Sequence, residues 1–440
     1  MSNLTTITRR PLRRLLQLDQ PVQLLTPDEA EVERDRHLRW NFLVNSFDVI
    51  FFMGGLSLIS STTILPLFIS KLTSSTLPLA LMAMLAQGGF MLPQLLTANI
   101  IERLDRKKPI VVNIGFLTER LPAILFILAP LAAYRSPTLA VVLLLLLYSW
   151  FTFGGGMVAA AWQDMIARCF PVTQRGRFFG GTMFIGTLLG VGAASIAGQV
   201  LDRVAFPLNF IYLFAVAGMA ITLSWTFLAL TREPVVKASV PRRTTRQYLV
   251  ELPKVVQTDH NFRSFLLARF VLALAEMGSG FLTVAAIQMW AISDGMVATF
   301  TTASLVGQTA GSLLMGFLAD RRGHRLSLEL AALTAVFAFA LAWLAPDPNW
   351  FIGTFFLLGF FSGARIVSGM LVVVEFCAPE KRPTYIGLTN TLAGIGSMAA
   401  PLLGALLVKI SYTWVFAASV VVSLLAFLML RFWVKEPREV

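Results

Sequence analysis

Long apolar segments alternate with short polar ones along almost the whole chain. Each apolar segment has about 20 or more residues, the length that an α-helix needs to cross the hydrocarbon core of a bilayer. Because unpaired backbone groups are costly in lipid, we expect each segment to be a helix. Twelve spans are predicted, at 42–69, 77–98, 109–133, 138–163, 178–201, 206–230, 264–290, 296–318, 326–345, 349–374, 385–408 and 413–434.

These spans divide into two sets of six. The pattern therefore predicts an all-α membrane protein with an amino-terminal bundle over 41–230 and a carboxy-terminal bundle over 262–434. The polar segment 231–261 is the linker between them, 1–40 is an amino-terminal tail, and 435–440 is a short carboxy-terminal tail.

The amino-terminal tail contains one helix-start signal. Thr26 and Glu29 have the spacing of a capping box, and Pro27 stands at the first helical position, so a juxtamembrane helix is predicted over 27–39. No long apolar run precedes Asn41, and a cleaved signal peptide is therefore not expected.

Composition and charge agree with a membrane protein. The chain has 440 residues, of which 56% are hydrophobic and 14% are charged. Its 36 lysine and arginine residues concentrate in both tails and in the loops after even-numbered spans, whereas the opposite loops contain only Lys71, Arg135, Arg203 and Lys409. This bias predicts a multi-pass protein of the cytoplasmic membrane with both termini in the cytoplasm. The net charge of +12 then matches an anionic leaflet, and no nucleic-acid partner is expected.

Few residues have the chemistry of an enzyme. The two cysteines, Cys169 and Cys377, end the fourth and tenth spans on the predicted cytoplasmic side, where we expect free thiols. Three histidines in polar segments form no metal-ligand cluster, so no metal is predicted. There is also no Gly-x-x-x-x-Gly-Lys-Ser/Thr loop for ATP. A membrane-embedded enzyme remains the alternative from another class.

A short motif occurs twice. Gly316-Phe-Leu-Ala-Asp320-Arg321-Arg322-Gly323-His324-Arg325 follows the eighth span, and a degraded copy, Ala98-Asn-Ile-Ile-Glu102-Arg103-Leu104-Asp105-Arg106-Lys107, follows the second. Written as Gly-x-x-x-Asp-Arg-x-Gly-Arg-Arg/Lys, it resembles the signature loop of the major facilitator superfamily of transporters. The resemblance implies two pseudo-symmetric six-helix bundles. It also implies a secondary transporter that lies in the lipid bilayer, acts as a monomer, needs no cofactor and moves a small molecule.

In that superfamily the signature loop takes part in a cytoplasmic charge network. Carried over by position, its members here are Gly316, Asp320, Arg321, Gly323 and Arg325, and in the first half Glu102, Arg103, Arg106 and Lys107. The carboxylates expected to face them are Asp164 and Glu375. The first copy departs from the pattern, so the two halves are expected to latch unequally. The alternative is that these basic residues only set the topology.

Charged residues within the spans are costly unless they are paired or face water. Asp48 and Glu276 are the candidates for proton coupling, with Arg269 and Arg365 as ion-pair partners or as anchors for an anionic substrate. The alternative is that all four form structural pairs. Glu119 and Arg120 are adjacent, cannot share one face of an α-helix, and are interpreted as structural.

Other spans carry aromatic and small residues. Tyr148, Trp150 and Phe360 are candidate cavity residues, although such side chains also face lipid or the membrane interface. Stripes of small residues, at 186, 190, 194 and 198 and at 396, 400 and 404, predict close helix packing. The function predicted is proton-coupled efflux of an amphipathic or drug-like compound. Uptake of a small organic anion by proton symport is the alternative, and sodium is the other candidate ion.

Overall fold

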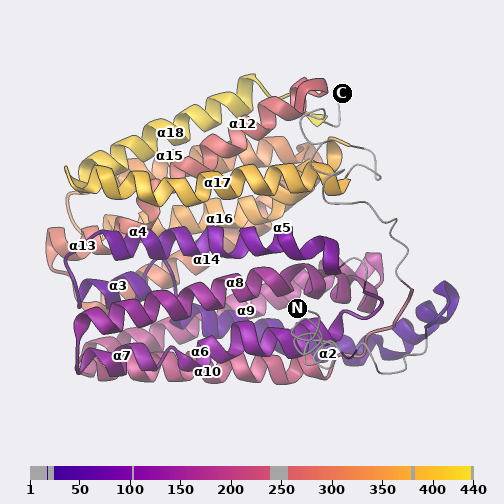
Figure 1. Cartoon of the computed structure of the whole chain (residues 1–440). Helices are drawn as coiled ribbons and strands as arrows, with labels where there is room; N and C mark the ends of the chain where they lie inside the picture. Colours follow the sequence, from indigo (N-terminus) through magenta and orange to yellow (C-terminus); the bar gives the residue numbers. More distant parts are fainter. Residues whose placement is uncertain (1–16, 18–23, 102–103, 238–255, 378–381, 438–440) are drawn as a thin grey trace, which may run out of the picture.

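The computed structural model describes residues 17, 24–101, 104–237, 256–377 and 382–437. The regular structure of this part of the chain is helical (Figure 1). In the first half the elements are α2 (Pro27–Leu58), α3 (Ile64–Ser70), α4 (Leu77–Met84), η1 (Leu85–Gly89), α5 (Phe90–Ile101), η2 (Ile110–Ile114), η3 (Phe116–Arg120), α6 (Leu121–Leu125), α7 (Leu128–Ala133), α8 (Pro137–Cys169), α9 (Val172–Arg203) and α10 (Leu208–Ala229). In the second half they are α12 (His260–Ala275), η4 (Glu276–Phe281), α13 (Leu282–Trp290), α14 (Asp294–Arg322), α15 (His324–Leu344), α16 (Trp350–Glu375), α17 (Arg382–Val408) and α18 (Tyr412–Phe432).

Eleven stretches of the described chain are long and apolar enough to cross a membrane. The remaining predicted span, 77–98, corresponds to α4, η1 and α5 in succession. The predicted capping box is present, because the Thr26 side chain accepts from the Glu29 N–H and the Glu29 carboxylate accepts from the Thr26 N–H. The helix that starts there does not end at residue 39, however. It continues without a break to Leu58, since no glycine or proline interrupts 28–53.

Several spans contain non-α turns. Segments η1, η2 and η3 are π-helical, and η4 in the middle of the seventh span is a 3₁₀ helix. Gly278 and Gly280 within η4 weaken the α-helical preference there. Such local changes of winding are common at functional positions in helices.

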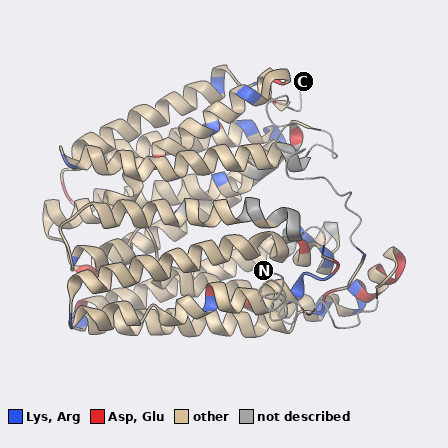
Figure 2. Cartoon of the chain, in the orientation of Figure 1, with Lys and Arg blue, Asp and Glu red and all other residues tan. Residues whose placement is uncertain are grey.

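The two halves form two bundles that lie side by side (Figure 1). Charged residues gather at one end of the molecule, near the carboxyl terminus (Figure 2). We call this the basic end, and it contains Lys107, Arg168, Arg175, Arg325 and Arg431. The opposite end contains α3 and α13.

The hydrophobic core connects the halves at the opposite end only. One large cluster joins Phe68 and Phe210 of the first half to Phe281, Phe300 and Phe416 of the second. Toward the basic end each half has a separate cluster of its own residues. The bundles therefore share a continuous core at one end and have separate cores at the other.

Polar contacts between the halves also lie at the opposite end. The Thr63 and Thr301 hydroxyls are 2.6 Å apart, and the Thr283 hydroxyl donates to the Thr62 carbonyl over 2.7 Å. In addition, Lys71 Nζ lies 2.7 Å from Asp294 Oδ1, and the Gly295 N–H donates to Asp202 Oδ1 over 2.6 Å.

Candidate functional site

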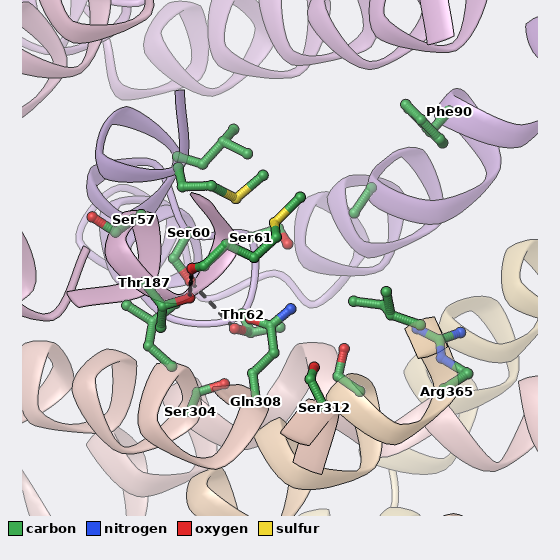
Figure 3. A pocket seen from close by; sticks show the side chains of 18 of the residues that line it. Ser57, Ser60, Ser61, Thr62, Phe90, Thr187, Ser304, Gln308, Ser312 and Arg365 are labelled. Atoms are coloured by element: carbon green, nitrogen blue, oxygen red, sulfur yellow. Dashed lines mark hydrogen bonds between the residues drawn. The ribbon is translucent and has the colours of Figure 1, made fainter. Parts of the chain in front are cut away.

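A cavity of about 1150 Å³ lies between the two halves. Its wall combines apolar and aromatic side chains from both halves with many hydroxyl groups. Figure 3 shows labelled polar side chains around it, namely Ser57, Ser60, Ser61, Thr62 and Thr187 from the first half and Ser304, Gln308 and Ser312 from α14. A mainly apolar wall with a few polar groups suits a small amphipathic ligand.

The cavity extends toward the basic end. There its lining includes Arg175 and Gly180, near the start of α9. At the other end it reaches Thr62 and Thr301, beside the buried hydroxyl contact between Thr301 and Thr63. Together with the shared core, these contacts close the cavity at the opposite end, and its approach lies at the basic end.

An ion pair stands in the wall of the cavity. Arg365 Nη1 of α16 lies 2.9 Å from Glu276 Oε1 at the start of η4, and both residues line the cavity. Arg269, which precedes Glu276 in the same span, is 8% exposed. Its guanidinium lies over Gly369 of α16, and its charge acts on both members of the pair. The structure thus brings together three of the charged residues that the sequence singled out.

Asp48 has a different environment. It is buried on α2, where it accepts a hydrogen bond of 2.6 Å from Ser224 of α10. The described cavity lining does not include it, because this face of α2 packs against α10 instead. Asp48 and Glu276 are therefore not equivalent sites.

Glu119 and Arg120 pair with each other. Arg120 Nη1 contacts Glu119 Oε2 within η3, and both side chains are buried. Adjacent positions do not share a face of the helix, but these two side chains are long enough to reach one another. Glu119 also lines the cavity, beside Gly155 of α8.

Only one of the three predicted cavity aromatics lines the cavity. Tyr148 of α8 does so, but Trp150, two positions further along, is 41% exposed and is absent from the described lining. Two positions correspond to about 200° around a helix, so these side chains point in nearly opposite directions. The backbone of Phe360 packs against α14, and its neighbour Phe361 lines the cavity instead.

At the basic end of the first half, Lys107 and Asp164 meet as the resemblance implies. Lys107 Nζ is 3.2 Å from Asp164 Oδ2 and also donates to the Ile101 carbonyl. Arg168 Nη2 contacts the same Asp164 oxygen at 3.2 Å, and its Nη1 is 3.5 Å from Glu233 Oε1. Glu233 also accepts from the backbone N–H groups of Lys107 and Lys108.

The remaining first-half members of the expected network are less well placed. Arg106 acts electrostatically on Glu233. Glu102 and Arg103 lie outside the described residues.

In the second half, the described contacts of Arg325 lie within and beside its own helix. Arg325 Nε lies 2.8 Å from Glu329, one turn along α15, and Arg431 is 3.6 Å from the same carboxylate. Glu375 faces His324 Nε2 at 3.8 Å. Arg325 does not need to cross to α16, because Glu329 is its (i, i+4) neighbour.

The remaining second-half members of the expected network are Gly316, Gly323, Arg321 and Asp320. Gly316 lies near Val367 of α16, and Gly323 has a φ of 92°, which favours glycine. Arg321 is exposed near the end of α14. The side chain of Asp320 lies outside the described part of the chain.

Sequence reasoning missed Glu233 and Glu436, which occupy matching positions in the two halves. A Glu-Pro step follows the last span of each half, at Glu233-Pro234 and Glu436-Pro437. Glu233 caps the start of the third span, and the Glu436 carboxylate lies against Gly323, just before α15. The repeated Glu-Pro step was the signal that could have identified both.

Comparison with solved structures identifies the fold. A mutant of the nucleoside transporter NupG superimposes with a TM-score of 0.68 at 13% identity, covering 90% of this chain and 100% of that one. A POT family transporter in complex with 5-aminolevulinic acid gives 0.64 at 12% identity, covering 91% and 97%. Residues 265–440 match the family model of the Major Facilitator Superfamily. The carboxy-terminal part of the chain is thus similar to the major facilitator superfamily, and the whole chain shares the fold of these solved transporters.

The relatives that match parts of this chain are transporters by name. The Uncharacterized MFS-type transporter YdgK of Bacillus subtilis (strain 168) is 27% identical over 151 residues, which are 33% of this chain and 37% of YdgK. Multidrug resistance protein 3 of the same organism is 27% identical over 140 residues, 32% and 27% of the two chains. The matched segments thus cover about a third of each relative. The eleven apolar helical stretches make this a multi-pass membrane protein.

The charge balance around Glu276 gives a stability prediction. Glu276→Gln leaves Arg269 and Arg365 side by side without a carboxylate, whereas Arg365→Gln leaves Glu276 with Arg269. Breaking a buried pair costs about 3–5 kcal/mol, and contact with cavity water lowers this to roughly 1–3 kcal/mol. We expect Glu276→Gln to lower the thermal unfolding midpoint of the purified protein clearly more than Arg365→Gln. Equal losses would contradict the inferred role of Arg269.

Glu233 gives a pH prediction. Burial raises the pKa of its carboxyl above the usual range, against the opposing effect of the Lys107 and Lys108 N–H groups and of Arg168. The folded protein therefore binds this proton more tightly than the unfolded chain, so stability falls as the pH rises through the raised pKa.

Glu233→Gln keeps an acceptor for the backbone N–H groups but does not titrate. We expect its unfolding midpoint to vary less than that of the wild type from acidic to neutral pH. Glu31→Gln, at an exposed position of α2, serves as the matched control and should retain the wild-type profile. A Glu233→Gln profile parallel to the wild type would contradict this assignment.

Proposed function

We propose that this protein is a secondary active transporter that exports a small amphipathic compound across the cytoplasmic membrane in exchange for protons. The observation that carries the proposal is the cavity between the halves, which is closed at one end and has the Glu276 and Arg365 ion pair in its wall. Such a cavity can serve as a carrier site if the halves rock and open it alternately to each side.

The positive-inside bias supports an orientation with the basic end in the cytoplasm. In that orientation the cavity is approached from the cytoplasm, the side from which an exporter takes its substrate. Names among the relatives agree with export. They include Multidrug resistance protein 3, and the MFS-type efflux pump MFS1 of Arthroderma benhamiae, which is 35% identical over 78 residues, 17% of this chain and 15% of that one.

The second candidate is uptake of a small organic anion together with a proton. It is favoured by the local charge around η4, where Arg269 and Arg365 outnumber Glu276. An anionic group of a substrate can accept from guanidinium donors, which match carboxylates well in geometry. This feature supports an acidic group on the substrate in either transport direction.

Reconstituted proteoliposomes with an imposed proton gradient test the proposal. Two fluorescent aromatic probes of opposite charge, carboxyfluorescein and ethidium, report on the substrate class. We expect gradient-driven movement of carboxyfluorescein, abolished by a protonophore and weakened in Arg365→Gln. Movement of the probe opposite to the protons supports export, and movement with them supports the second candidate. No gradient-driven movement of either probe would refute proton-coupled transport of such compounds.

A further inference from the structure

Each half of the protein buries a group of three charged side chains beside the cavity. The first-half group consists of Asp48, Glu119 and Arg120, which are 4%, 9% and 4% exposed. The second-half group consists of Arg269, Glu276 and Arg365. Because charges inside a membrane are costly unless compensated, the balance of charge within each group decides what it can bind.

The second-half group has an excess of positive charge. Its single carboxylate, on Glu276, contacts Arg365 at 2.9 Å and also feels the charge of Arg269. Guanidinium groups do not release their protons in proteins. Two permanent positive charges therefore face one carboxylate in this group.

The first-half group has the opposite balance. Two carboxylates share one guanidinium, because Arg120 contacts Glu119 and its charge also acts on Asp48. With all three groups ionised, one negative charge in this buried site has no counter-ion of its own. One proton on either carboxylate removes the excess charge and leaves an ion pair with Arg120.

The elements packed around this group supply no further described charge. Gly155 of α8 lies beside Glu119, so that a Cβ there would stand 3.0 Å from Glu119 Oε1. Trp162 of α8 and Ser224 of α10 face Asp48, and the Ser224 hydroxyl donates to it over 2.6 Å. These neighbours are uncharged, so Arg120 is the cation for both carboxylates.

Access to water distinguishes the two carboxylates. Glu119 lines the cavity, whereas Asp48 is turned toward α10. A hydronium ion in the cavity can give its proton to a Glu119 oxygen and leave a water molecule. The Glu119 contact with Arg120 then weakens, and the guanidinium is free to compensate Asp48.

We propose that Glu119 is the residue that binds and releases the coupled proton, with Arg120 and Asp48 as its positioning partners. The inference rests on the proposed proton coupling and assigns it to a residue that the sequence pattern had marked as structural.

Infrared difference spectra of the purified protein between acidic and alkaline pH test this without any substrate. A carboxylic acid that titrates gives a carbonyl stretching band, and the position of that band depends on the side chain that carries it. Glu233 and the exposed carboxyls contribute bands of their own, which serve as an internal reference. We expect one further wild-type band to shift in Glu119→Asp and to vanish in Glu119→Gln. The charge-preserving controls Asp48→Glu and Glu276→Asp should leave it in place.

The assignment to Glu119 would be overturned if this band shifts in either control, or if no carboxyl band of the wild type changes in the Glu119 variants. If Glu119→Gln does not fold, the three charge-preserving variants still decide the question. The outcome of the proteoliposome experiment is independent of the infrared result. Absence of proton-driven probe movement would refute the proposed function while the infrared result stands on its own.

Discussion

Replacing Gly363 by alanine should destabilise the protein, although alanine is the better helix former. Gly363 of α16 packs directly on α14, where an added Cβ would meet the Gln308 carbonyl and would stand 2.7 Å from the Ser312 N–H nitrogen. The partners are backbone atoms, so no side chain can move aside. Overpacking of this kind costs about 1–3 kcal/mol or more, against a helix-propensity gain of about 1 kcal/mol.

Gly353→Ala, on the same helix, is the matched control. A Cβ there would lie 3.6 Å from Leu341 Cδ1, an ordinary contact. We expect the thermal unfolding midpoint in detergent to fall for Gly363→Ala and to stay or rise for Gly353→Ala. The prediction fails if both variants are stabilised, because α14 and α16 would then tolerate the extra atom.

The packing between α14 and α16 shows how far the sequence could predict the helix contacts. Gly307 and Gly311 face the Phe356 and Phe360 carbonyls, and Gly359 and Gly363 face α14 in return. Both pairs have the small-x-x-x-small spacing, but so do the stripes on α9 and α17. The spacing indicates that a helix packs closely on one face, and it does not indicate against which helix or how closely.

The spans themselves could be predicted well, because lipid imposes a minimum length and an apolar composition on each one. Their winding could not. Hydropathy responds to side chains averaged over about 20 residues and is insensitive to one turn of π or 3₁₀ helix. The sequence argument about Glu119 and Arg120 failed for a different reason, because it considered the faces of the helix and not the reach of two long side chains.

The candidate site was partly predictable for a similar reason. Glu276 and Arg365 are 2.9 Å apart because a charged residue in a span needs a partner or water, and few charged residues are available. The same rule gave no means of deciding which partner Asp48 would find. The Ser224 hydroxyl of α10 donates to Asp48, and serines are too common in spans to single out Ser224 beforehand.

The contacts at the opposite end lead to the second prediction with a large effect. A substitution there should reverse which end of the cavity is open. Gly198 of α9 is buried against α14, and a Cβ at this position would be 3.1 Å from Ala298 Cβ. A tryptophan at position 198 has no room while this end is closed. Opening of this end removes the clash, so Gly198→Trp should favour the state in which the cavity faces away from the basic end.

Relief of about 1–3 kcal/mol of overpacking corresponds to a shift of roughly five- to a hundredfold in the ratio of the two states. Spin labels on cysteines introduced at Arg135 and Asn349, in loops of the two halves at the opposite end, report the separation there. The native Cys169 and Cys377, which are free thiols, are first replaced by serine. We expect the distribution of label distances to move to longer values in Gly198→Trp.

Gly192→Trp on the same helix is the control. It distinguishes a steric clash between α9 and α14 from a general disturbance of the fold by tryptophan. Nothing lies within 4 Å of a Cβ at position 192, and this position is exposed, so the side chain starts from open space. Its label distances should match those of the parent protein. If both tryptophan variants lengthen the distances equally, the α9 and α14 contact does not hold the opposite end closed. If neither does, the halves separate elsewhere, and the closure must reside in the shared core around Phe281 and Phe300.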